Sequence, residues 1–147
     1  MKEFLKIVSG GQTGVDRGAL KAAIDLGLPW GGWAPKGWRS EDGAIPPKYR
    51  SEMKECASAN YLVRTRKNVV DSHATLIITN TYPLSGGTLK TRHITEEAMR
   101  SHFVVSLTEE DAVGKVQLKA YRRVLCVLEE KNGSTKKLHP IKSKVRS

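Results

Sequence analysis

A strand, a glycine-rich turn and a helix start follow one another in the stretch Ile7-Val8-Ser9-Gly10-Gly11-Gln12-Thr13-Gly14-Val15-Asp16-Arg17. The apolar residues from Phe4 to Val8 predict a buried strand. Three glycines within five residues let the backbone adopt tight or positive-φ conformations and let a ligand approach the main chain. The unpaired N–H groups and the positive dipole end of the following helix favour an anion. The stretch therefore predicts a turn that binds a phosphate or another oxyanion, with a turn needed only for packing as the alternative.

This turn matches neither of the two common phosphate-binding motifs. The spacing Gly11-x-x-Gly14-x-x-x-Gly18 differs from the dinucleotide pattern G-x-G-x-x-G, and no Gly-Lys-Ser/Thr follows as in a P-loop. Gln12 and Thr13 add side-chain donors to the turn. A bulkier residue at Gly11 is expected to block the ligand and to weaken binding more than folding.

Length and composition predict a single soluble domain. The chain has 147 residues, of which 39% are hydrophobic and 27% are charged. No apolar run approaches the roughly 18 residues of a membrane span, and no signal-peptide pattern opens the chain, so a cytoplasmic protein without a membrane partner is expected. The cysteines Cys56 and Cys126 are expected to be buried free thiols. Neither they nor the histidines show metal-ligand spacing, so no metal site is expected.

The formal net charge of +10 predicts anionic partners. Part of that charge lies in residues 129–147, where six Lys and Arg residues stand against two acidic ones. We expect residues 1–128 to form a ligand-binding domain and residues 129–147 to form a basic, solvated and partly disordered tail. Nucleic acid is not an expected partner, because no aromatic residues interleave with the charges of this tail.

Strands and helices alternate along the chain. Strands are expected at 4–8, 29–35, 74–79, 103–107 and 124–128, helices at 15–26, 89–101 and 109–121, and a loop at 36–48. This order predicts an α/β fold with an open parallel sheet of about five strands. In such sheets ligands bind in a crevice at the carboxyl ends of the strands. The glycine-rich turns at 9–14 and 85–88 both follow strands, so they should share one cleft.

Several ordered motifs resemble those of the "putative molybdenum carrier" family, which belongs to the SLOG group of Rossmann-like nucleotide-sensing proteins. The motifs lie at residues 9–20, 32–37, 40–43, 64–69, 71–77 and 86–91. The resemblance covers roughly residues 4–107. It implies a Rossmann-like fold with helices on both faces of the sheet, assembly into a homo-oligomer and a positively charged cleft. The ligand it implies is molybdenum cofactor or another nucleotide-like anion.

Three positions depart from the patterns of these relatives. Residues 126–131 (Cys-Val-Leu-Glu-Glu-Lys) stand where family members usually have an Asn-x-Ala-Gly-Pro-Arg-like segment. His73 stands where an Asp is usual. Thr91 stands where the related nucleoside-monophosphate phosphoribohydrolases carry a catalytic Glu, and a hydrolase of that type needs a carboxylate at the glycosidic centre. The last departure favours binding without turnover.

The leading hypothesis is therefore a binding or carrier protein for a phosphate-bearing, nucleotide-like anion such as molybdenum cofactor. The alternative is a nucleotide-processing enzyme that uses Asp16 or Asp42 as a base, although Asp16 equally suits a helix start. The residues expected to hold the oxyanions are Gly10, Gly11, Gln12, Thr13 and Gly14 in the first turn and Ser85, Gly86, Gly87 and Thr88 in the second. The residues expected to supply charge are Lys36, Arg39, Arg64 and Arg66, and Asn68 is expected to supply a neutral hydrogen bond.

Overall fold

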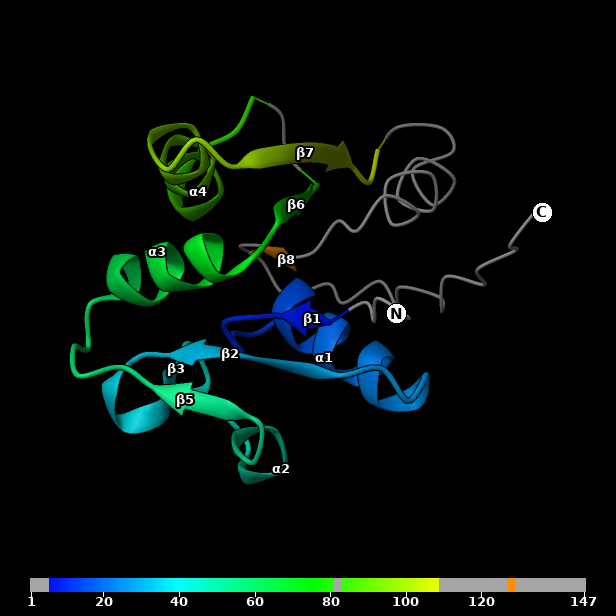
Figure 1. Ribbon diagram of the computed structural model, residues 1–147, viewed down its shortest axis with the longest axis vertical. Coiled ribbons are helices and arrows are strands. Elements are labelled where there is room, and N and C mark those ends of the chain that lie inside the picture. Colours follow the sequence, from blue (N-terminus) through cyan, green and yellow to red (C-terminus); the bar gives the residue numbers. More distant parts are fainter. Residues whose placement is uncertain (1–5, 81–82, 109–126, 129–147) are drawn as a thin grey trace.

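The computed structural model describes residues 6–80, 83–108 and 127–128 (Figure 1). In chain order the elements are β1 (Ile7–Val8), α1 (Val15–Asp25), β2 (Trp30–Ala34), the short 3-10 helix η1 (Lys36–Trp38), β3 (Arg39–Ser40), β4 (Gly43–Ala44), α2 (Pro47–Arg50), β5 (Met53–Glu55), α3 (Tyr61–Asp71), β6 (Ala74–Thr79), α4 (Gly86–Glu97), β7 (Ser101–Ser106) and β8 (Val127–Leu128).

Two three-stranded parallel sheets carry the fold. In the first, β2 lies between β1 and β5, with Ile7 opposite Trp30 and Gly32 opposite Met53. In the second, β6 lies between β7 and β8. Only the small β3–β4 hairpin is antiparallel among the ladders of the described residues. The predicted α/β class with parallel strands is therefore confirmed.

Helices cover both faces of the second sheet. Leu76 and Ile78 of β6 pack with Val15 of α1, whereas the intervening Ile77 packs with Val104 of β7. Successive side chains of a strand point to opposite faces. Because α1 occupies the face of Leu76 and Ile78, α4, which also contacts β6 and β7, covers the opposite face.

The first sheet likewise has helices packed on its two faces. Ala34 of β2 packs with Leu20 of α1 and Met53 of β5. The adjacent Trp33 faces α3 instead, because its indole Nε1–H donates to Asp71 Oδ2 of that helix at 2.7 Å. In Figure 1, α3 and α4 lie next to each other, and the two helices are in contact.

The long buried elements lie close to where the sequence predicts them. Helix α1 ends near Gly27, whose φ of +66° fits the predicted cap, and β6 spans the predicted residues 74–79. Strand β2 falls within 29–35, and β7 begins two residues before the predicted 103. Helix α4 begins at Gly86 rather than near Leu89, so two glycines predicted to form a turn belong to the first turn of the helix.

Other expectations were incomplete. Residues 36–48 contain η1, the β3–β4 hairpin and the start of α2, where a loop was predicted. Helix α3 and the short strand β5 were not predicted at all. Cys56 is buried, as expected, and burial raises the pKa of its thiol. The predicted helix at 109–121, the tail at 129–147, residues 4–5, Cys126 and the first part of the last strand lie outside the described residues. None of the described helices combines the length and apolar character needed to cross a membrane.

Candidate ligand-binding site

The turn between β1 and α1 takes a backbone path that depends on its glycines. Gly11 and Gly14 have φ values of +71° and +81°, in the region that favours glycine. Ser9 closes the turn from inside: its hydroxyl donates to the backbone oxygen of Asp16 at 2.9 Å and accepts from the Gly11 N–H at 3.2 Å. A Cβ at Gly11 would contact Ile45 and Met53, at 3.0 and 3.1 Å. A side chain there would therefore press on the side chains of Ile45 and Met53, so a bulkier residue at Gly11 is expected to lower stability as well as to block the ligand.

A buried ion pair lies directly behind this turn. Arg64 of α3 and Asp16 of α1 are both fully buried, with Nη1 and Oδ2 separated by 3.6 Å. The same Oδ2 accepts the Gln12 backbone N–H at 3.1 Å. A Cβ at Gly10 would overlap the Arg64 guanidinium, since it would lie 2.9 Å from Cζ. Arg64 therefore supports the turn from behind and lies outside the cavity lining described below.

The β3–β4 hairpin is fastened to the front of the turn. Gln12 Nε2 donates to the Arg39 backbone oxygen at 2.9 Å, and the Thr13 hydroxyl donates to Glu41 Oε2 at 3.1 Å. Arg17 reaches the hairpin as well, because its guanidinium binds both carboxylate oxygens of Asp42, at 2.5 and 2.7 Å. The position of the hairpin is thus set by three residue pairs. Two of them involve the turn, and the third involves the first turn of α1.

The Arg17–Asp42 pair makes stability depend on pH. Hydrogen bonds from Arg17 and Ser40 hold the pKa of Asp42 well below its ordinary value. A carboxylate with a lowered folded-state pKa stabilises the fold above its unfolded pKa, about 3.9. That contribution is lost as the pH falls through the lower folded-state pKa.

We therefore expect Asp42→Asn to lower the urea midpoint of unfolding at pH 7, with the difference from the wild type shrinking below about pH 4. Asp25→Asn is the matched control, because Asp25 forms an exposed pair with Lys21. Equal midpoints for wild type and Asp42→Asn at pH 7 would contradict the stabilising role of this pair.

The second glycine-rich segment forms the N-terminus of α4. Ser85 is the N-cap residue, and its backbone oxygen accepts from the Thr88 hydroxyl at 2.7 Å. The Thr91 hydroxyl donates to the Gly87 backbone oxygen at 2.9 Å. These two hydroxyls therefore bind their own helix, while Gly87 and Lys90 face a cavity.

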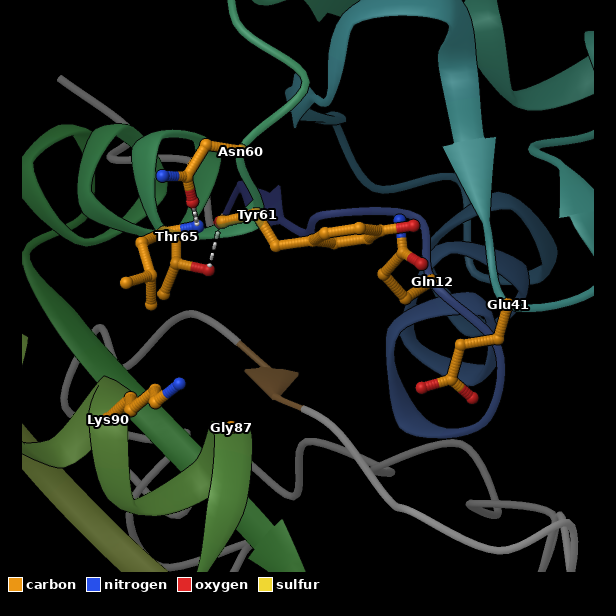
Figure 2. Close-up of a pocket in the computed structure, with 8 residues that line it drawn as sticks. Gln12, Glu41, Asn60, Tyr61, Thr65, Gly87 and Lys90 are labelled. Atoms are coloured by element: carbon orange, nitrogen blue, oxygen red, sulfur yellow. Dashed lines mark hydrogen bonds between the residues drawn. The ribbon is translucent and has the colours of Figure 1, made fainter.

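This cavity has a volume of about 470 Å³ and lies where the two glycine-rich segments meet (Figure 2). It is lined by Gln12, Glu41, Asn60, Tyr61, Leu62, Thr65, Gly87 and Lys90. Gln12 comes from the first segment and Gly87 from the second, so both predicted turns border one cavity. Figure 2 shows Gln12 and Glu41 on one side, Lys90 and Gly87 on another, and the Tyr61 ring beside Gln12.

The cavity is polarised. Lys90 stands one turn into α4, close to the helix start, where the unpaired amides and the helix dipole also attract an anion. Glu41 places a carboxylate near Gln12, whose side chain is almost fully buried, with the residue 2% exposed. Gln12 Oε1 has no hydrogen-bond partner among the described residues. A buried acceptor without a donor costs about 1–3 kcal/mol.

None of the predicted basic residues lines this cavity. Lys36 is exposed on η1, Arg66 pairs with Glu97 at 2.7 Å on the surface, and Arg39 contributes its backbone oxygen to Gln12. Asn68 is buried and holds β2, since its side chain accepts from the Trp33 N–H and donates to the Trp33 backbone oxygen. Together with Arg64, all five predicted contributors to charge and hydrogen bonding therefore lie outside the cavity lining.

Sequence reasoning missed most of the lining. Asn60, Tyr61, Leu62 and Thr65 come from the start of α3, which was not predicted as a helix. Lys90 had a usable signal, because it follows Gly87 by three residues and so lies about one helical turn further on. Among the described residues, no three His, Cys, Asp or Glu side chains are grouped so that they could hold a metal ion.

Comparison with known proteins gives this geometry a context. Residues 7–132 match the circularly permutated YpsA SLOG family. The chain is also similar to a crystal structure named "putative molybdenum carrier protein" from Syntrophus aciditrophicus SB, with 38% sequence identity and a TM-score of 0.76. That similarity covers 84% of this chain and 80% of the other. No curated protein matches.

Proposed function

Because the chain belongs to the circularly permutated YpsA SLOG family, we propose that it is a binding protein for a phosphate-bearing, nucleotide-like anion, with molybdenum cofactor as one such ligand. The name of its similar structure, a molybdenum carrier, supports a carrier role. The expected homo-oligomer and the cytoplasmic location stay predictions.

The observation that carries this proposal is the meeting of the two glycine-rich segments at one polar cavity. Gly87 in the first turn of α4 and Lys90 one turn further on offer an amide-lined helix start and a cation to a phosphate. Gln12 brings the first segment to the same space. The exposed Tyr61 ring provides a flat face on which a heterocycle can stack.

These residues also suit molybdenum cofactor. Its phosphate would bind at Gly87 and Lys90, and its ring system would lie along Tyr61 with a hydrogen bond to the buried Oε1 of Gln12. The cofactor would supply its own metal chemistry, and the role of this chain would be to hold the organic part and its phosphate.

Lys90→Ala is expected to weaken ligand binding at least about tenfold, because a hydrogen bond to a charged group contributes about 1.5–3 kcal/mol. The measurement is calorimetric titration with AMP, GMP, UMP and a phosphorylated pterin. Lys36→Ala is the matched control, since Lys36 is an exposed lysine outside the cavity lining. This control variant should bind each compound with the affinity of the wild type. Equal losses in both variants, or no saturable binding of any of the four compounds, would contradict the proposal.

The alternative of a nucleotide-processing enzyme is tested on the same mixtures. Asp16 and Asp42 are each paired with an arginine and lie outside the cavity lining, whereas Glu41 is a carboxylate that lines it. Product analysis after incubation should show no turnover. Turnover above about 1 per second that disappears in Glu41→Gln would replace the carrier proposal with an enzymatic one.

A further inference from the structure

We propose that Gln12 and Glu41 form an acceptor pair that selects a ring presenting adjacent N–H donors, such as the 2-amino-4-oxo edge shared by guanine and pterins. This inference rests on the proposed function, because the ring is taken to carry the phosphate bound at α4. It goes further by assigning ligand selectivity to two named side chains at the opposite side of the cavity.

The orientation of the Gln12 amide is the first step. Its Nε2 donates to the Arg39 backbone oxygen at 2.9 Å, and a carbonyl oxygen can only accept. That contact fixes which end of the amide is nitrogen, so Oε1 is the end left for another partner. Oε1 is buried and has no hydrogen-bond partner within the described ranges, on a residue that lines the cavity. Because an unpaired buried acceptor is unfavourable, a donor on the ligand bound in this cavity is the partner that the proposal assigns to Oε1.

Glu41 supplies the second acceptor. Its Oε2 accepts a hydrogen bond from the Thr13 hydroxyl at 3.1 Å. Because Thr13 directly follows Gln12 in the turn, this bond holds the carboxylate near Gln12. An ionised carboxylate only accepts hydrogen bonds, and its two oxygens have capacity for further donors. Two adjacent N–H donors on one ring edge can each donate to one oxygen of a carboxylate, as the two N–H groups of an arginine do in a bidentate pair.

The charges of the cavity oppose a different choice of ligand at this end. A bare oxyanion beside Glu41 would meet a like charge and an acceptor at Gln12, and neither offers it a donor from the side chain. Lys90 and the start of α4 provide the favourable position for the anion instead (Figure 2). The cavity thus suits a ligand with donors at one end and negative charge at the other, with Tyr61 available for stacking.

The test compares GMP with IMP by calorimetry on the full chain, because IMP differs only in lacking the 2-amino group. We expect GMP to bind at least about tenfold more tightly, since IMP leaves an acceptor without its donor. Neopterin monophosphate, titrated alongside GMP, distinguishes a pterin ring from a guanine ring. Tighter binding of GMP than of IMP is the result that supports the inference.

Glu41→Gln keeps the size of the side chain and removes the carboxylate, so it should bring the GMP-to-IMP affinity ratio close to one. Glu52→Gln, an exposed residue outside the cavity lining, should leave that ratio unchanged. Saturable binding of GMP and IMP with equal affinity, or a ratio unaffected by Glu41→Gln, overturns this inference and leaves the carrier proposal standing. If none of the phosphorylated compounds binds, the carrier proposal fails and the inference fails with it.

Discussion

Arg64→Met is expected to lower the free energy of unfolding by about 3–5 kcal/mol, because it removes the cation paired with a buried carboxylate. Both Arg64 and Asp16 are fully buried, and the carboxylate of Asp16 also receives the backbone N–H of Gln12. A methionine fills a similar length of space but leaves the negative charge of Asp16 without this guanidinium. Equilibrium unfolding in urea measures the loss.

The matched control lies two residues further along the same helix. Arg66 pairs with Glu97 at 2.7 Å, but both side chains are more than half exposed, at 53% and 60%. Exposed pairs contribute about 0–1 kcal/mol, so Arg66→Met should change stability little. Similar losses in the two variants would show that the burial of the Arg64–Asp16 pair has no particular importance.

Gly32→Ala is expected to destabilise the protein by about 3 kcal/mol or more, through backbone strain and overpacking together. Gly32 has a φ of +137°, and a Cβ built there would overlap the Ser9 backbone oxygen and lie 2.9 Å from the Ser9 carbonyl carbon. The backbone of Ser9, which directly follows β1, cannot move aside as a flexible side chain can. Because Ser9 begins the glycine-rich turn, the variant should also disturb the cavity.

Gly18→Ala provides the control for this glycine. Gly18 lies inside α1, and a Cβ there would have no heavy atom within 4 Å beyond the backbone of its own helix. Alanine in a helix is favoured over glycine by about 0.5–1 kcal/mol, so this variant should be more stable than the wild type. Thermal and urea unfolding of both variants give the two opposite signs, and a tolerated Gly32→Ala would contradict the close approach of β2 to Ser9.

Local pattern explains why the main elements were predictable. The apolar run of β6 and the helical spacing of apolar residues in α1 each reflect a face buried against the same core. The glycine-rich turn could be recognised because positive φ at Gly11 and Gly14 is a requirement of the backbone itself. The resemblance to this family, which the sequence motifs indicated, was confirmed by the family match over residues 7–132.

Short elements and polar helices escaped this reasoning. Strand β5 has three residues, and its place depends on pairing with β2 and on burial of Met53 among residues distant in sequence. Helix α3 carries Arg64 and Asn68 on its buried face, so its apolar periodicity is interrupted where the helix meets the sheet and the turn. Polar residues satisfied by tertiary partners look like surface residues in a sequence.

By itself, the sequence determined the parallel α/β class, the family and the two glycine-rich segments, because periodicity and glycine placement are properties of neighbouring residues. Only the tertiary structure decided which charges serve the cavity. An arginine can be neutralised by a ligand or by a carboxylate of its own chain, and the choice depends on distances between segments far apart in sequence. Arg64 meets Asp16 behind the turn, whereas Lys90 and Glu41 line the cavity. The packing of α3, α4 and the β3–β4 hairpin beside the turn thus brings one cationic and two acceptor side chains to the same cavity.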